Sequence, residues 1–411
     1  MKKTVLYIML IILWSAKAQT GQTTNTGILY VAPGTLVTVI SDFDNTETGE
    51  FENNGETLFR ANFNNDGITT FDPSFQGYTR FEGFNNQNIT GSIPADFYDV
   101  LFRNENSQPA FRLYGNIGIS GNADFFQGVV KNDDYGGTIV FEEGATHTNA
   151  DHDSHVDGLV QKNGAEAFQY PIGDFGYHRF AAISAPGNPD AVFNAKYYYD
   201  NSNFLYPHQN KIGIIEFIND KEYWTLTKEG DSEDVLLTLS WDESTTPQEL
   251  ITEPHEAIHI VRWDEIQRLW VSEGGTVDLE SKTVTSWIEV LGYGVFTLAR
   301  VEVEQNVRDV VVYNAVTPNG DGINDYFYID DVNLYPTNKV IIYNRWGRKL
   351  YETTNYDNEG NVFKGYSGAD LTIGGELLPS GTYFYTFEYL YNINGQSRKK
   401  RKVGFLHLQT N

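Results

Sequence analysis

A glutamate flanked by two histidines four positions apart forms the clearest metal-binding pattern of the chain. The segment reads Pro254-His255-Glu256-Ala257-Ile258-His259, the order in which zinc peptidases arrange their metal ligands and general base. On a helix these histidines would share one face, whereas on a strand they lie about 13 Å apart, too far to bind one zinc ion. Pro254 precedes the first histidine and β-branched residues surround the second. We therefore predict a strand here and no peptidase activity.

Three histidines and three aspartates form a second group further upstream. They are His147, Asp151, His152, Asp153, His155 and Asp157. Nitrogen and oxygen ligands at this density suit zinc, copper or calcium. Asn, Asp and Ser also satisfy the backbone of tight turns, and the group lies where the first region of the chain ends. We favour the turn interpretation, with metal binding as the alternative.

Asn319, Asp321 and Asp325 form a third group of oxygen-bearing residues, with two glycines between them. Oxygens two positions apart, a glycine and a later carboxylate are features of calcium-binding loops. Thr317 stands where such a loop normally begins with Asp, and Tyr328 stands at the twelfth position, normally a bidentate Glu. Two interpretations follow: the loop binds calcium, or its Asn and Asp side chains bond their own backbone in a tight turn.

The composition of the 411-residue chain favours an almost all-β protein. It contains 26 Tyr, 26 Phe and 7 Trp, together with frequent glycine-containing turns. Cysteine is absent, which excludes thiolate zinc sites and thiol nucleophiles. The net charge of −26 belongs to the residues before 312, because residues 312–411 hold ten basic and ten acidic side chains. A surface this acidic repels nucleic acid, so we expect no nucleic-acid partner.

Residues 1–18 have the pattern of a secretory signal peptide. Two lysines precede an apolar run over residues 5–14, and Ala16-Lys17-Ala18 offers a cleavage site with small residues on both sides. The run is too short to cross a hydrocarbon core of roughly 30 Å. We therefore expect the mature chain to begin near Gln19 and to retain no transmembrane span.

The length and spacing of the apolar segments divide the rest of the chain into regions. Residues 19–160 hold short apolar segments separated by Asn, Gly and Asp, which would share one core if they were stacked as turns. The stretch 97–160 resembles the short parallel β-helices of bacterial surface proteins, and a β-sandwich is the alternative. Residues 161–303 have longer alternating strands, which predict an antiparallel β-sandwich. The polar segment 304–311 is the predicted linker.

Three ordered motifs occupy the last hundred residues. They comprise Pro318, Asn319, Gly320, Asp321, Gly322, Asn324 and Asp325, then Asn344, Arg345, Trp346 and Gly347, and finally Pro379, Gly381, Thr382 and Tyr383. Their order and spacing resemble the gliding-motility-associated C-terminal domain of Bacteroidota, the type B sorting signal of the type IX secretion system. Phe363 begins a segment where that family usually has a Trp-Asp/Asn-Gly turn. The resemblance implies an Ig-like β-sandwich over residues 312–411 that the secretion machinery recognises.

These observations predict a secreted protein placed at the outer-membrane cell surface. We expect an adhesin-like or structural role, with a connection to gliding as one option. The alternative is binding or degradation of extracellular polysaccharide, for which aromatic grooves beside convergent carboxylates would be the sign. The partners expected are the type IX secretion machinery and either a surface glycan or an outer-membrane anchor protein. No cofactor besides calcium is predicted.

Overall fold

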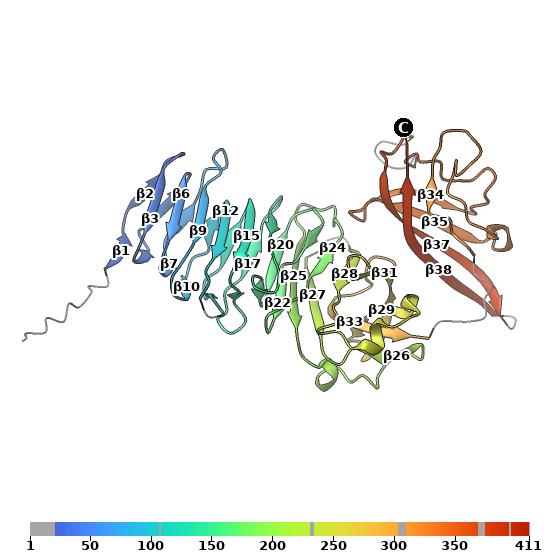
Figure 1. Cartoon of the computed structure of the whole chain (residues 1–411), viewed down its shortest axis with the longest axis horizontal. Coiled ribbons are helices and arrows are strands. Elements are labelled where there is room, and N and C mark those ends of the chain that lie inside the picture. Colours follow the sequence, from blue (N-terminus) through green and yellow to red (C-terminus); the bar gives the residue numbers. More distant parts are fainter. Residues whose placement is uncertain are drawn as a thin grey trace, which may run out of the picture.

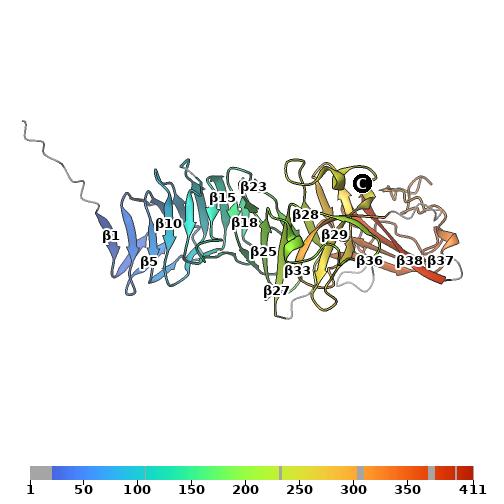
Figure 2. The ribbon, with the colours of Figure 1, turned by 90° about the horizontal axis from the view of Figure 1, so that it is seen from below.

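The computed structural model describes residues 21–106, 108–230, 234–302, 310–368, 375–393 and 396–410. It has 47% of its residues in strands and 4% in helices, which confirms the predicted all-β class. The predicted signal peptide 1–18 and most of the predicted linker, residues 304–309, lie outside the described residues. The molecule is a rod, with a β-helix at one end and the C-terminal sheet at the other (Figures 1 and 2).

The N-terminal part is a β-solenoid of about six turns, which confirms the predicted parallel β-helix. Each turn contributes one strand to each of three parallel sheets, A, B and C. Sheet A contains β1 (Gln22–Asn25), β4 (Asp42–Asn45), β7 (Phe63–Asn65), β10 (Gln87–Thr90), β13 (Phe111–Leu113), β16 (Val130–Lys131), β19 (Val156–Asp157), β22 (Ile172–Asp174) and the antiparallel β23 (Tyr177–His178). Sheet C contains β3 (Leu36–Val39), β6 (Glu56–Phe59), β9 (Tyr78–Phe81), β12 (Asp99–Arg103), β15 (Asn122–Gln127) and β18 (Thr146–Thr148).

Stacked phenylalanines hold the turns of the β-helix together. Phe81 pairs in register with Phe59 on one side and with Phe102 on the other. Its ring stacks on both of theirs, with ring centres 5.6 and 5.8 Å apart. A second row is polar, because Asn25 Nδ2 donates to Asn45 Oδ1, and Asn45 Nδ2 to Asn65 Oδ1, both at 2.8 Å. The same kind of side chain at the same point of successive turns is thus what builds the core.

Sheet B continues from the β-helix into the central region. Its parallel strands are β2 (Ile28–Val31), β5 (Glu50–Asn53), β8 (Ile68–Thr70), β11 (Ala95–Phe97), β14 (Ile117–Ile119), β17 (Ile139–Phe141) and β20 (Val160–Asn163). Antiparallel strands follow in the order β25 (Val192–Tyr198), β27 (Tyr223–Glu229), β33 (Gly294–Val301), β29 (Ile258–Asp264) and β30 (Leu269–Gly274), and β26 (Ile215–Ile218) also pairs with β33. One cluster of buried apolar side chains extends from the β-helix into this region.

A second sheet of the central region, sheet D, faces the sorting domain. It contains β21 (Phe168–Gln169), β24 (Ala181–Ile183), β28 (Leu237–Ser240), β32 (Thr283–Thr285) and β31 (Thr276–Asp278). The short helices of the chain are η1 (Ser202–Phe204), α1 (Gln248–Ile251), η2 (His255–Ala257) and η3 (Val332–Leu334). No helix in the described ranges is long and apolar enough to cross a membrane.

The C-terminal region has its own sheet and its own core. The sheet order is β34 (Ala315–Val316), β38 (Gln396–Leu408), β37 (Gly381–Ile393), β35 (Asn338–Tyr343) and β36 (Lys349–Thr354). Buried side chains of this sheet pack with Phe327, Ile329, Tyr356 and Phe363 from the connecting segments. Those segments also form isolated β-bridges, such as the one between Val312 and Ile329. The core is therefore separate from that of the central region.

Candidate functional site

The three sorting motifs converge at one end of the C-terminal sheet. Val316 and Gly381 both pair with Leu408, so the first and third motifs meet around the end of β38. On the other side of β37, Phe384 pairs with Tyr343, and the Asn-Arg-Trp-Gly turn starts at the next residue. Segments up to 65 positions apart in the sequence are thereby brought to the same edge of the domain.

The Asn-Arg-Trp-Gly turn between β35 and β36 is held by its asparagine. Asn344 Oδ1 accepts hydrogen bonds from the N–H groups of Trp346 and Arg348, each at 2.9 Å. Gly347 has φ of +73°, which favours glycine, and its N–H donates to the Asn344 carbonyl at 3.0 Å. The Arg345 guanidinium lies 4.6 Å from the centre of the Trp346 ring. The turn is thus a preformed hairpin tip that presents Arg345 and Trp346.

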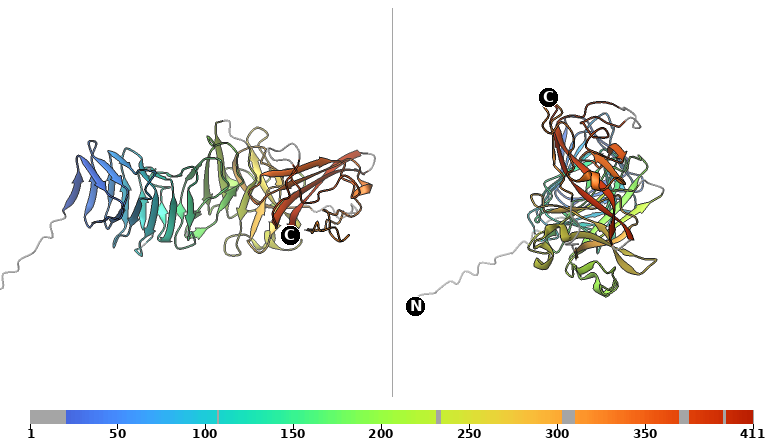
Figure 3. Two further views of the ribbon diagram at one scale, coloured as in Figure 1. Left: turned by 90° about the horizontal axis from the view of Figure 1, so that it is seen from above. Right: turned by 90° about the vertical axis from the view of Figure 1, so that its right-hand side faces the viewer.

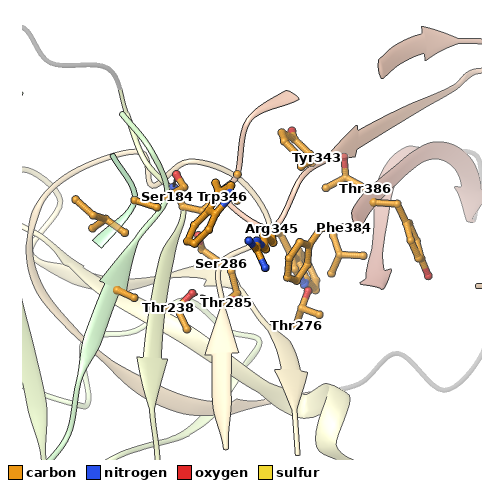
Figure 4. Close-up of a pocket in the computed structure, with 18 of the residues that line it drawn as sticks. Ser184, Thr238, Thr276, Thr285, Ser286, Tyr343, Arg345, Trp346, Phe384 and Thr386 are labelled. Carbon is orange, nitrogen blue, oxygen red and sulfur yellow. Dashed lines mark hydrogen bonds between the residues drawn. The ribbon is translucent and has the colours of Figure 1, made fainter. Parts of the chain in front are cut away.

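This turn contacts the central region. The N–H of Ala185 donates to the carbonyl of Trp346 at 3.0 Å. Gly347 lies so close to sheet D that an added Cβ would come within 2.3 Å of the Ser184 Cβ. Figure 4 shows the Trp346 side chain beside Ser184. The contact between the second sorting motif and sheet D is therefore our candidate functional site.

A cavity of about 230 Å³ lies at this contact. Sheet D forms one wall, and β35, β37 and β38 of the sorting domain form the other. Its volume is somewhat below the roughly 300–1,000 Å³ of ordinary small-molecule sites. The residues labelled in Figure 4 that line it are Ser184, Thr238, Thr276, Thr285, Ser286, Tyr343, Arg345, Trp346, Phe384 and Thr386.

The lining of the cavity is rich in hydroxyl groups and aromatic rings and carries a single charged side chain. That residue is Arg345, and all residues of the lining belong to the described part of the chain. Thr238 and Thr285 share a hydrogen bond of 2.8 Å between their hydroxyls. Trp287 also lines the cavity, and its buried Nε1 has no hydrogen-bond partner among the described residues. Burial, and then the negative charge of Glu289, raises the pKa of Tyr343 to about 12, so its hydroxyl stays neutral.

In the loop considered as a calcium site, the side-chain oxygens of the aspartates accept hydrogen bonds from backbone N–H groups of the same loop. Asp325 accepts the N–H groups of Gly320 and Gly322 at 2.6 and 2.8 Å. Asp321 Oδ1 accepts the N–H of Ile323 at 2.8 Å. The Asn319 amide donates to the other Asp321 oxygen at 2.9 Å, and this bond lowers the pKa of Asp321. These bonds fit the turn interpretation, and calcium binding stays a prediction.

Two of the three aspartates of the His-rich segment are likewise engaged, one in a turn and one in an ion pair. Asp151 Oδ1 accepts the N–H groups of Asp153 and Ser154, at 2.8 and 3.0 Å. Asp157 pairs with Lys131 at 3.1 Å. Within the described ranges, no three His, Asp or Glu side chains are placed to hold a metal ion. This geometry fits the favoured turn interpretation.

Of the three histidines of that segment, His155 lies in the core at the junction of the β-helix and the central region, whereas His147 is half-buried and His152 is exposed. His155 is fully buried, and its ring centre lies 6.2 Å from that of His178 on β23. Burial lowers the pKa of His155 to about 4, and burial together with the neighbouring His155 lowers that of His178 to about 3. Both imidazoles are therefore neutral at pH 7. His178 is a member of this cluster that the sequence did not indicate.

The His-Glu-x-x-His segment is not an α-helix. The predicted strand is wrong for His255 and Glu256, which belong to the 3₁₀ turn η2, and is confirmed around His259 as β29. His259 is buried, with Nδ1 2.8 Å from the Ser272 hydroxyl and its ring 4.7 Å from that of Trp287. Glu256 is exposed. His259 therefore has a packing role next to the wall of the cavity, and absence of peptidase activity stays a prediction.

The comparison with protein families identifies the C-terminal region. Residues 310–408 match the CHU_C Type IX secretion signal domain, which confirms the predicted sorting domain. The chain is thus an exported protein, and the match supports its export by the type IX secretion system and its placement at the surface or outside the cell. The same match implies an interaction with the secretion machinery. No curated protein and no solved structure shows significant similarity to the chain.

Proposed function

We propose that the exported chain is an adhesin-like surface protein that acts as a stiff rod. The observation that carries this proposal is the continuity of sheet B, which runs from β2 in the first turn of the β-helix to β30. A single buried cluster crosses the junction, so residues 21–302 have no flexible hinge of their own where the β-helix ends. The sorting domain lies at one end and the first turn at the other (Figure 3).

Attachment of cells to surfaces tests this role. A strain without the gene should attach less than the wild type, and complementation with the full chain should restore attachment. Purified protein without residues 1–18, added to wild-type cells, should compete for the same sites and lower attachment. Unchanged attachment in the deletion strain, with the protein present at the wild-type surface, would refute the role.

Glycan binding is the second candidate, and the cavity at the Asn-Arg-Trp-Gly turn favours it. Aromatic rings, hydroxyls and the Arg345 cation suit a saccharide that bears a carboxylate or sulfate. Glycoside hydrolysis uses a pair of carboxylic acids, and the lining contains neither Asp nor Glu. We therefore propose binding without cleavage at this site.

A glycan array with the mature protein tests the second candidate. We expect retention of uronic-acid or sulfated glycans, and loss of at least about tenfold in affinity on Arg345→Ala, which removes a charge-assisted hydrogen bond. Arg348→Ala is the matched control, because Arg348 is exposed in the same turn but does not line the cavity. Equal effects of the two substitutions would point to non-specific attraction between charges.

A further inference from the structure

The first turn of the β-helix ends in three strand edges without partners. β1, β2 and β3 are the terminal strands of sheets A, B and C, and each pairs on one side only, with β4, β5 and β6. No other described strand lies on the free side. The backbone N–H and C=O groups of that side can pair with a further strand. All three edges lie at the end of the rod farthest from the sorting domain (Figures 1 and 2).

In the described residues, this end lacks the charged side chains that normally protect a strand edge. Charged side chains on edge strands discourage pairing with other chains, but no residue from Gly21 to Ser41 is charged. Ile28, Leu36 and Ile40 are exposed at 76%, 60% and 81%. In the next turn, the register partners of Ile28 and Leu36 are glutamates. The first turn is thus apolar on its outer face where its neighbour is acidic.

The interior of the β-helix is also incompletely covered here. Leu29 and Val37 have register partners, Phe51 and Thr57, that are buried in the next turn. Leu29 and Val37 pack against the same core but are only partly buried. Because every turn of a solenoid is covered by its neighbours, a further layer of strands would complete the burial of these two side chains.

At the opposite end of the β-helix, sheets A and B already continue into further strands, and of the described parallel strands only β18 of sheet C has a free edge there. Sheet B continues there into the central region through the pairing of β20 with β25, and sheet A ends in the β22–β23 hairpin. A second copy therefore cannot stack head to tail on this end. Only the first turns of two copies can meet, and this contact closes after two molecules.

We propose that two copies of this chain pair end to end through their first turns. A two-fold axis normal to sheet A would place β1 antiparallel to β1 of the second copy and β2 antiparallel to its β3. This arrangement sets the apolar outer residues Ile28 and Tyr30 against Leu36 of the second copy and satisfies all three edges. An added strand from an unrelated protein would satisfy only one. If the chain is displayed as proposed above, the pairing would join two rods by their tips, but the dimer itself does not depend on that role.

Charge next to the contact predicts how the dimer responds to salt. Residues 42–60 hold six acidic side chains and one arginine, and they form most of the turn behind the contact. Two such turns repel each other across the interface, and salt screens charges that are about a Debye length of 8–10 Å or more apart. The dimer should therefore become more stable as the salt concentration rises, which is the opposite of an interface held by ion pairs.

Analytical ultracentrifugation of the mature protein, residues 19–411, tests the proposal. Over roughly 1–100 µM we expect a monomer–dimer equilibrium that shifts toward the dimer with salt. Ile28→Lys should weaken dimerisation about tenfold, because it replaces the apolar contact with Leu36 by a charge at both places where β2 of one copy meets β3 of the other. Ile68→Lys is the matched control, since Ile68 lies in the same column two turns away and is 58% exposed. A monomer under all conditions, or equal effects of the two variants, would overturn the proposal.

Crosslinking gives a second measurement that does not require an equilibrium constant. The chain contains no cysteine, so a single introduced cysteine is the only thiol. Thr24→Cys on β1 should yield a dimer with a short bis-maleimide reagent. Asn64→Cys, two turns away in the same column, should stay monomeric. Crosslinking of both variants to the same extent would show that contact is not made through the first turn.

Discussion

The β-helix and the sorting domain both consist of strands, but the residues that pack together in their cores have different separations along the sequence. In the β-helix, the members of a stack such as Phe59, Phe81 and Phe102 are 21 or 22 positions apart and come from successive turns. In the sorting domain, a row of buried rings alternates along the single strand β37: Tyr383, Tyr385, Phe387, Tyr389 and Tyr391. One turn can therefore be removed from the β-helix without changing how the remaining turns pack. In the sorting domain, by contrast, each strand occurs only once and has no equivalent that could replace it.

Removal of the sorting domain should have the largest effect. Deletion of residues 312–411 is expected to leave the cargo folded but trapped in the periplasm, because all three sorting motifs are lost. Cell fractionation with immunoblotting measures the distribution. The control is deletion of residues 43–62, which removes one turn and puts Phe63 in the place of its register partner Phe43. This shortened protein should still be exported, and normal export of the chain without 312–411 would contradict the assignment.

The separate cores predict two unfolding transitions. Phe81→Ala should cost about 3–5 kcal/mol in the transition of the β-helix and central region, because it leaves a cavity in a stack of rings. Phe387→Ala should lower the other transition by a similar amount. Differential scanning calorimetry resolves the two. A single transition that both substitutions shift equally would show that the contact at the Asn-Arg-Trp-Gly turn couples the domains.

Acid should act on the larger unit through its buried histidines. His155 has a pKa of about 4 when folded and an ordinary value of about 6.5 when unfolded, so the unfolded chain takes up the proton first. Stability from this group is present above pH 6.5 and is lost as the pH falls toward 4, by up to about 3 kcal/mol. His155→Gln should flatten this loss in denaturant titrations at several pH values. His407→Gln, an exposed histidine of the sorting domain, is the control, and equal slopes for both variants would refute the burial argument.

The parts of the structure that the sequence predicted are those encoded locally. The alternation of apolar and polar residues along the strands indicated the all-β class. Asn344 and Gly347, which hold the turn after β35, belong to a motif whose order and spacing resemble those of a known family. The 20-residue spacing of Asn25, Asn45 and Asn65 is a further signal in the sequence for the turns of the β-helix.

Contacts between distant segments could not be predicted in this way. Sheet B passes from β20 to β25, across the predicted boundary at residue 160, through a pairing that neither strand's own pattern specifies. The cavity likewise combines Ser184, Trp287 and Arg345, which lie on three separate segments. The residues next to them in the sequence do not indicate that these three side chains meet. Their proximity depends on how the sorting domain packs against sheet D, which is a tertiary property.

The smallest effect is expected at the loop that precedes the sorting sheet. Asp325→Ala removes the acceptor of the Gly320 and Gly322 N–H groups and should cost about 1 kcal/mol, or roughly 4–8 °C in the melting temperature of a domain of this size. Glu359→Ala removes the same charge without such bonds and is the control. The turn interpretation requires that this loss be the same in calcium and in chelator. If millimolar calcium instead stabilises the sorting domain and Asp321→Ala removes the increase, the oxygens of this loop bind an ion, because a ligand stabilises only the state that holds it.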